Sequence, residues 1–383
     1  MKSTGTSLRS TFLLLRRRQS TKVNGVWTNF SERAASLQLN NEHIKETLFG
    51  EGNPEEGPAS LINQEDRSAY HSPVAIDETF QMAYKILERD AESKYQVVHR
   101  LKKSLANTTS DKDALALRNQ IDKYLVDAEI ENPEVLYNAE FMDPEHLDKS
   151  QPVYRHLLKE KWENYDLLVT MQRLEQLHVI PDTLPTLVPK ADVKIKFTHN
   201  TDEQFSKWVT PGALLPAFAV SKPPTIHVQE FDRVEGNNNL YTVLLVNPDT
   251  PDLRTNSFTT TLHYGLKNVV LNNVDNSINI SKLLTVGPKI TFKEYVPLAP
   301  EKNAPAQRAC LWVFRQTKEL GDLAESSENF DIREFAANHG LTAVGAHVWR
   351  QTYDRSVPEI RKMYGLGEGR VYEKARSMDP INL

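Results

Sequence analysis

The spacing of apolar residues changes at the proline-rich segment HVIPDTLPTLVP, residues 178–189. Before this segment, apolar residues recur at three- and four-residue steps, which is the spacing of one face of a helix. After it, short runs alternate apolar and polar residues, which is typical of half-buried strands. The segment itself carries three prolines, which interrupt both kinds of element. We therefore predict an α+β fold, with a helical extension over 77–182 followed by a β-sandwich domain over 183–360.

Three amphipathic helices are predicted in the extension. The first has an apolar stripe from Phe80 to Leu105, the second follows Asp111, and the third begins after Pro152, where proline suits the first helical turn. Charged residues such as those at 88–92 crowd the other faces, which indicates helix surface turned to solvent. Helices this long with narrow apolar stripes cannot all pack on themselves. We expect some to pack on the β domain or on another subunit.

Strands and turns are predicted in the second half. The strands are VKIKFTH at 193–199, TIHVQE at 225–230, LYTVLLV at 240–246 and CLWVFRQ at 310–316. The segments EGNNN at 235–239 and KNVVLNN at 267–273 have the composition of turns. Helix is expected again only near the end, in FDIREFAANHG at 330–340, where Gly340 is suited to end it.

The first 31 residues differ in composition from the rest. They hold six basic and no acidic residues and are rich in Ser and Thr, which is typical of a mitochondrial presequence. A basic tail that touches nucleic acid is the alternative. Removal of the six positive charges would take the formal net charge from −5 to −11. Because the remaining chain would be this acidic, we do not expect it to bind RNA through a broad basic face. Its partners are therefore expected to be mainly proteins. Residues 32–76 carry scattered Gly and Pro and are predicted to be an extended arm or linker.

The chain lacks the sequence signatures of the common enzyme and metal classes. No P-loop, no H-E-x-x-H and no paired-cysteine motif occurs, and the single cysteine, Cys310, lies within an apolar strand pattern. We expect no catalytic residue, no cofactor, no metal site and no small-molecule substrate. No apolar run approaches the length needed to cross a bilayer, so no membrane span is expected.

Several segments of the second half form a combined pattern. NPDTP lies at 247–251, a histidine follows Asn247 by 16 positions at His263, PAQRA lies at 305–309, and a D-x-x-V-P motif ends at 358. Together these segments resemble the phosphatidylethanolamine-binding protein family, whose members carry a D-P-D-x-P loop, a pocket histidine and a G-x-H-R-Y motif. The resemblance covers about 185–360 and implies the family's β-sandwich and its ligand pocket.

Half of the pocket pattern is replaced. The matching residues are Asp249, His263 and Arg308, and the replaced ones are Asn247, Gln307 and Ala309, which stand for aspartate, histidine and tyrosine. An anionic head group needs imidazole and hydroxyl donors, with a carboxylate to hold the histidine tautomer. The three matching residues could still hold a small anion weakly. We favour the alternative that Asp249 shapes a turn, Arg308 pairs with a nearby carboxylate, and Ala309 leaves empty space. A vestigial anion pocket is predicted.

The presequence, the helical extension and the replaced pocket together resemble the family member found in mitochondrial ribosomes. That resemblance implies a structural component of the large subunit, at its central protuberance in the mitochondrial matrix, held by other large-subunit proteins and by some ribosomal RNA. The alternative function is a mitochondrial module that binds a phospholipid or anion, or inhibits a protease or kinase. The tail 361–383 has basic residues that are candidates for RNA contact: Arg361, Lys362, Arg370, Lys374 and Arg376. A solvated or protein-bound strand explains the tail equally well.

Overall fold

The computed structural model describes residues 25–27, 33–39, 41, 44–45, 63–70, 73–234, 239–323 and 326–373. The predicted presequence therefore lies outside the described residues except for 25–27. The chain divides into two compact units, Met1–Asn138 and Ala139–Leu383. This division falls within helix α5, Pro133–Phe141. The sequence pattern had placed the boundary at 182–183, after the last helix of the extension.

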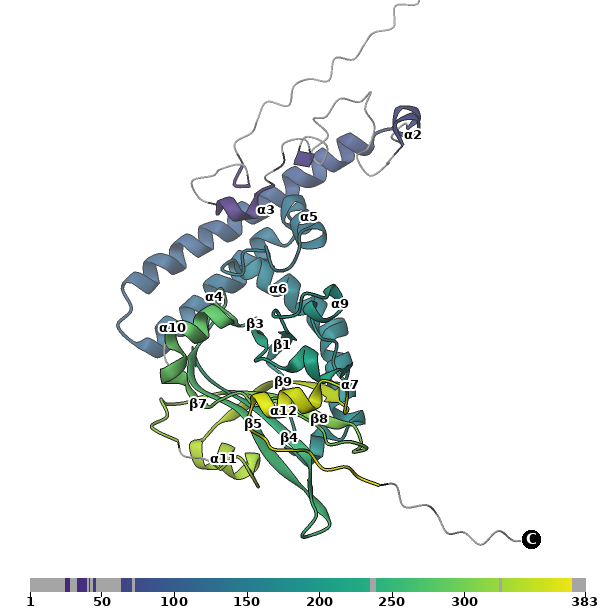
Figure 1. Ribbon diagram of the computed structural model, residues 1–383. Helices are drawn as coiled ribbons and strands as arrows, with labels where there is room; N and C mark the ends of the chain where they lie inside the picture. The colour runs from purple at the N-terminus through teal and green to yellow at the C-terminus, as the bar shows by residue number, and fades with distance from the viewer. Residues whose placement is uncertain are drawn as a thin grey trace, which may run out of the picture. The chain divides into compact units, whose positions relative to one another are not determined.

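Unit 1 is built on a helical hairpin. Helices α3, Ile76–Ala106, and α4, Asp111–Glu129, run side by side in Figure 1. Their shared core holds Ala91, Tyr95 and Ala128, with Trp27 packed against them. The short elements η1, Ala35–Leu37, and α2, Gln64–Ala69, lie in the segment predicted to be an extended arm. The first two predicted helices are present.

A buried arginine holds part of the predicted arm against the hairpin. Arg33 is 3% exposed, and its guanidinium lies 3.1 Å from Glu129 Oε1 and 3.3 Å from Glu134 Oε2. It also donates to the carbonyl oxygen of Leu37 at 2.8 Å. Residues 33–39 are therefore anchored. The nearby Glu88, predicted to face solvent, is buried and accepts the N–H of Trp27 at 3.3 Å, because the N-terminal segment covers it.

Unit 2 contains two β-sheets. The large sheet has the order β2-β9-β8-β4-β5-β7, and the small antiparallel sheet has the order β1-β3-β6. The strands are β1 Ala191–Lys196, β2 Leu214–Leu215, β3 Thr225–Glu230, β4 Leu240–Asp252, β5 Ser257–Val270, β6 Ser277–Ile278, β7 Thr291–Lys293, β8 Gln307–Arg315 and β9 Thr342–Gln351. The four strands predicted from alternation correspond to β1, β3, β4 and β8.

Helices flank the sheets and connect the strands. They are α6 Pro152–Lys161, η2 Trp162–Asp166 (one π-helical turn), α7 Leu167–Gln176, α8 Val179–Asp182, α9 Glu203–Ser206, η3 Ala217–Val220, α10 Ile280–Ile290, α11 Ile332–His339 and α12 Val357–Met363. The third predicted helix thus runs from α6 through α7. No described helix is both long and apolar enough to cross a membrane.

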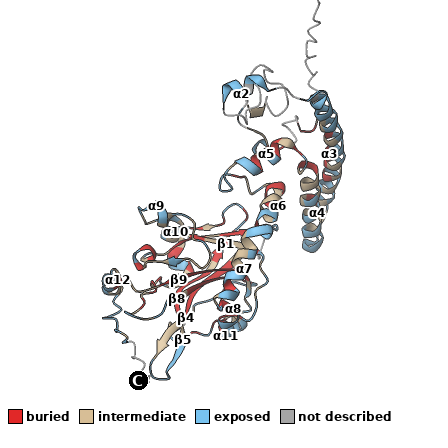
Figure 2. Cartoon of the chain, turned by 90° about the vertical axis from the view of Figure 1, so that its right-hand side faces the viewer, coloured by how far each residue is buried: buried red, intermediate tan, exposed pale blue. Residues whose placement is uncertain are grey.

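The core of unit 2 lies on both faces of the large sheet. Strand β4 is central and buried on both sides: Val243 packs in the cluster with Ile226 of the small sheet, and Leu244 packs in the cluster with Leu174 of α7 and Phe335 of α11. Figure 2 shows the same strands as a buried layer. The layers are small sheet, large sheet and helices, which confirms the predicted α+β class. Helix α7 belongs to this unit because its apolar face covers the sheet.

Two local predictions about unit 2 are wrong and one is confirmed. Strand β5 continues to Val270, through a segment predicted to be a turn, because its edge pairs with β4 up to the pair Leu240–Val270. Helix α10 was not expected before residue 330, although the side chain of Asn279 caps it by accepting the N–H of Lys282. Gly340 ends α11 in the left-handed conformation at φ 60°, as predicted.

Candidate functional site

The NPDTP segment lies inside strand β4 and not in a turn. The register between β4 and β5 shifts between Asn247 and Thr250, which marks a β-bulge, and pairing then continues to Asp252. The side chain of Asn247 accepts the N–H of Asp249 at 2.9 Å, a local hydrogen bond that this residue type makes readily. The expectation that Asp249 shapes a turn is therefore wrong. The bulge aims its carboxylate at the neighbouring strand β8.

Arg308 on β8 pairs with two carboxylates. Its backbone N–H donates to Asp249 Oδ2 at 2.8 Å and its guanidinium lies 2.5 Å from Asp249 Oδ1. The same guanidinium donates to Asp182 Oδ2 at 2.8 Å and to the carbonyl oxygen of Leu177 at 2.7 Å. The donors of Arg308 are thus engaged within the chain. Arg308 joins β8, the β4 bulge and the segment after α7, and the pairing with a nearby carboxylate is as predicted.

Two of the replaced positions bind one another. Asn247 Nδ2 donates to Gln307 Oε1 at 3.1 Å, and both side chains are buried. Gln351 on β9 lies opposite Gln307 in the strand register and is fully buried. Neither its Oε1 nor its Nε2 has a hydrogen-bond partner among the described residues. Where the family has aspartate and histidine, this chain has a cluster of neutral amides.

The sequence interpretation missed Gln351. Period-two alternation places it on the same face of β9 as Trp349 and His347, and a polar residue at such a position is the signal that could have revealed it. Ala309, predicted to leave empty space, is fully buried in register with Trp349, and both belong to one apolar cluster. That prediction is wrong, because the position is part of the packed core.

His263 does not join this cluster. Its Nδ1 lies 2.8 Å from the carbonyl oxygen of Val296, so Nδ1 carries the proton and donates. Burial lowers the pKa of His263 to about 4, so the imidazole is neutral at neutral pH. Of the three matching residues, Asp249 and Arg308 are brought together, while His263 bonds to the loop after β7.

The side chains at the family's pocket positions can offer a ligand only neutral hydrogen bonds. The one cation, Arg308, is held by Asp249 and Asp182, and the replaced positions carry amides and a methyl group. A phosphate-type ligand needs donors that are not already engaged, and charged donors bind it best. Among the described residues, no group of three or more histidine, cysteine or acidic side chains is placed to hold a metal ion.

The basic residues of the tail are only partly free. Arg361 donates to the carbonyl oxygens of Ala299, Leu366 and Gly367, each at 3.1 Å, and so holds the tail in place. The hydroxyl of Tyr364 donates to the carbonyl oxygen of Ser221 at 2.6 Å.

Two of the remaining RNA candidates lie among the described residues. Lys362 and Arg370 are exposed. Lys374 and Arg376 lie outside the described residues. The structure therefore leaves Lys362 and Arg370 as the described candidates for contact with RNA.

The chain is similar to a known family and to several solved structures. The model of the phosphatidylethanolamine-binding protein family matches residues 205–349. Similar solved structures include a carboxypeptidase Y inhibitor in complex with its proteinase (14% identity, TM-score 0.38, 48% of this chain and 95% of that one). A phosphatidylethanolamine-binding protein from Plasmodium vivax is another (16% identity, TM-score 0.35, 48% of this chain and 98% of that one).

Curated proteins that are similar in sequence include a ribosomal protein and a putative odorant-binding protein. The large ribosomal subunit protein mL38 of Schizosaccharomyces pombe is 30% identical over 239 residues, which cover 61% of this chain and 72% of that protein. A putative odorant-binding protein A5 of Drosophila melanogaster is 25% identical over 207 residues, 51% of this chain and 86% of that protein. With the family match over 205–349, these similarities show that the chain belongs to the phosphatidylethanolamine-binding protein family.

Proposed function

We propose that this chain is a structural component of the large subunit of the mitochondrial ribosome. The observation that carries the proposal is the 30% identity with the S. pombe large ribosomal subunit protein over 239 residues. That alignment covers 61% of this chain and 72% of the ribosomal protein.

The amide cluster at the family's pocket supports a role without a ligand. Asn247 Nδ2 donates to Gln307 Oε1 at 3.1 Å, and Ala309 is buried in the core opposite Trp349 of the neighbouring strand. We infer that the pocket of this chain is vestigial and that the chain is not an enzyme. Asp249 and Arg308 are retained because they hold three segments together, and this function is independent of any ligand.

Several finer features belong to the same proposal. We take 1–31 as a presequence for import into the matrix, 32–76 as an arm, and 361–383 as a tail. The proposed partners are other large-subunit proteins at the central protuberance. Ribosomal RNA is a further partner through a few basic side chains, of which Lys362 and Arg370 are exposed. Arg361 is excluded from this set, because its donors bind carbonyl oxygens of the chain itself.

Sedimentation of a mitochondrial lysate tests the proposal. The tagged chain should migrate with the intact ribosome in magnesium and with the large subunit after a chelator separates the subunits. A matched sample treated with ribonuclease controls for chance co-migration, because the chain should then leave the heavy fractions. A chain that stays in a slow soluble peak under all three conditions would refute the ribosomal role.

A lipid titration tests the vestigial pocket separately. Any micromolar binding of short-chain phosphatidylethanolamine or phosphoserine should be unchanged in Gln307→Leu, because no free cation or hydroxyl lies at the replaced positions. Micromolar binding that is lost in Gln307→Leu would favour the alternative, a ligand-binding or inhibitor module of the same fold.

A further inference from the structure

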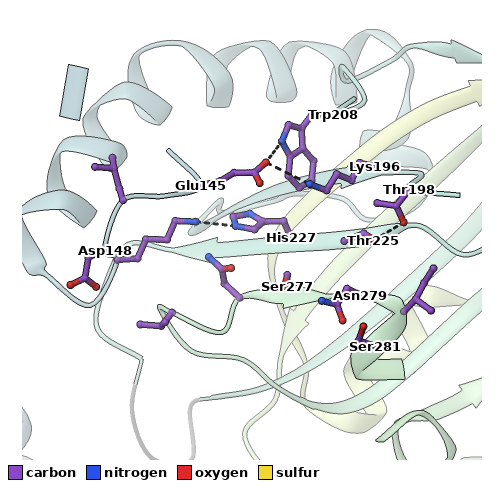
Figure 3. A pocket seen from close by; sticks show the side chains of 15 residues that line it. Glu145, Asp148, Lys196, Thr198, Trp208, Thr225, His227, Ser277, Asn279 and Ser281 are labelled. Carbon is purple, nitrogen blue, oxygen red and sulfur yellow. Dashed lines mark hydrogen bonds and ion pairs between the residues drawn. The ribbon is translucent and has the colours of Figure 1, made fainter. Parts of the chain in front are cut away.

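Unit 2 contains a cavity that is lined by none of the family-motif residues. It encloses about 530 Å³ and lies among β1, β3, β6 and the start of α10. Figure 3 shows Trp208, Lys196 and Glu145 on one side, and Ser277, Asn279 and Ser281 on the other, with His227 between them. Volumes of this size are typical of small-molecule pockets.

Lys149 contributes a positive charge that Glu145, Asp192 and Asp143 stabilise only from beyond ion-pair distance. Its Nζ lies 3.2 Å from Nε2 of His227, and it forms no ion pair with any carboxylate in the part of the chain that the structure describes. Because an ammonium group can only donate, Nε2 of His227 accepts and Nδ1 carries the proton. Burial lowers the pKa of Lys149, and burial followed by the charge of Lys149 lowers the pKa of His227 to about 3.

The other charges around the cavity are engaged. Lys196 lies 3.6 Å from Glu145 and 4.3 Å from the ring centroid of Trp208. Glu145 also accepts the indole N–H of Trp208 at 2.8 Å. Asp148 accepts the N–H of Ser150 at 3.0 Å, and in Figure 3 its carboxylate points away from His227. The ammonium of Lys149 is therefore the charge left for a ligand.

The first turn of α10 adds backbone donors to the same cavity. The helix has 11 residues, and Asn279 caps it by accepting the N–H of Lys282 at 2.8 Å. The amide groups of Ile280 and Ser281, which line the cavity, donate to no acceptor among the described residues. Free amides at a helix N-terminus attract anions, and here they line the same cavity as an ammonium that has no ion-pair partner among the described residues.

We propose that this cavity binds the phosphate group of a small phosphorylated ligand, of the class of nucleoside monophosphates. A tetrahedral phosphate offers enough acceptors for Lys149, for the amides of α10 and for the hydroxyl groups of Ser277 and Ser281. The cavity is larger than a phosphate ion needs, and its wall includes apolar side chains such as Leu147 and Val274. These surfaces suit an organic group attached to the phosphate.

Titration of the full chain tests the proposal. Inorganic phosphate and adenosine 5′-monophosphate are added in separate calorimetric titrations. Lys149→Met removes the ammonium and should weaken binding about tenfold or more, the effect of one charged hydrogen bond. Lys207→Met is the matched control, because Lys207 is exposed, pairs with Glu203 and does not line the cavity.

A second variant tests the helix donors. Ile280→Pro deletes one amide donor at the first position of α10. Proline is tolerated at that position of a helix, and the preceding residue, Asn279, has the extended conformation (ψ 172°) that a following proline requires. It should weaken binding several-fold while circular dichroism shows an unchanged fold. This variant keeps the test valid if Lys149→Met alters folding.

The outcomes separate the possibilities. Equal affinity for phosphate and the nucleotide indicates recognition of the phosphate alone, and tighter nucleotide binding indicates that the organic group is held too. Both support the proposal if the two variants weaken binding and Lys207→Met does not. Binding of neither probe overturns it, as does binding that both variants leave unchanged. Binding of a short RNA without either small probe overturns it as well, in favour of an RNA contact.

Discussion

Two arginine clusters, one in each unit, have similar chemistry in different surroundings. Arg33 in unit 1 binds Glu129 and Glu134, and its side chain is 0% exposed. Arg308 in unit 2 binds Asp249 and Asp182, and its side chain is 16% exposed. Each arginine also donates to backbone carbonyl oxygens, and each joins segments far apart in the sequence. The two clusters differ mainly in their access to water.

This difference separates structural from ligand-binding roles. Five donors in a planar fork allow one arginine to bind two carboxylates and a carbonyl oxygen at once. In both clusters those donors are used within the chain, so neither guanidinium is left for an anion. Water can replace a lost partner of Arg308 but not of Arg33. The same substitution should therefore cost more in unit 1 than in unit 2.

The largest effect is expected for Arg33→Met. This substitution leaves the buried Glu129 without its cation and Glu134 with only Lys45 at 3.6 Å, and breaking a buried pair typically costs about 3–5 kcal/mol. Hydrogen exchange should show faster opening of α3 and α4, whereas the strands of unit 2 keep their protection. Arg100→Met is the matched control, because Arg100 is exposed on α3. Equal protection of α3 and α4 in both variants would contradict the structural role of Arg33.

Acid should affect unit 2 through a buried histidine. His347 is 1% exposed, and burial lowers its pKa to about 4 while its Nε2 donates to the carbonyl oxygen of Val209 at 3.0 Å. The unfolded chain takes up a proton below about 6.5 and the folded chain does not. Stability of unit 2 should therefore fall by up to about 3 kcal/mol as the pH drops from 6.5 toward 4.

The variant His347→Gln isolates this contribution. Glutamine keeps a donor for Val209 and does not titrate, so the loss of stability between pH 6.5 and 4 should be smaller in the variant. Denaturant unfolding monitored by exchange in β8 and β9 is the measurement. The described residues of unit 1 include no buried histidine, so α3 and α4 serve as the internal reference. A pH profile identical to that of the parent chain would rule out His347 as the cause.

Asp249→Asn should cost less than the change at Arg33. The amide keeps the shape and weakens two charged hydrogen bonds, while Asp182 and Leu177 still hold Arg308, so about 1–3 kcal/mol is expected. Asp252→Asn is the matched control on the same strand, because Asp252 accepts only from the neighbouring turn, at Arg254 and Thr255. Thermal unfolding compares the two. Equal midpoints would show that Arg308 does not depend on Asp249.

Much of the fold could be predicted from the sequence, because periodicity and caps are local. Helix α4 begins at Asp111, α6 begins at Pro152 and Gly340 ends α11, each for a reason visible in a few neighbouring residues. Local signals also caused the errors. Gly287 and Pro288 are residues typical of a helix end, and both lie in the last turn of α10. Because they interrupt the helical pattern of this short segment, α10 was not predicted.

The two arginine clusters show which parts of the sites could be predicted. The pairing of Arg308 with a nearby carboxylate was predicted, because Arg308 belongs to a recognisable motif, but Asp249 was not predicted to be the partner. The pairing of Arg33 with Glu129 was not, because it joins residues 96 positions apart with no pattern in either segment. The cavity at Lys149 was missed for the same reason, since its walls come from separate elements on both sides of residue 200.

The smallest effect is expected at the neutral amide pair. Gln307→Leu removes the acceptor of Asn247 Nδ2, and a lost neutral hydrogen bond costs ~1 kcal/mol. The variant should sediment with the large ribosomal subunit as well as the parent chain, because the proposed role does not use the pocket. Loss of co-sedimentation with an unchanged unfolding midpoint would mean that this amide cluster touches a partner. The residues of the vestigial pocket would then form a contact with a partner. The proposal that the ribosomal role does not use this pocket would be wrong.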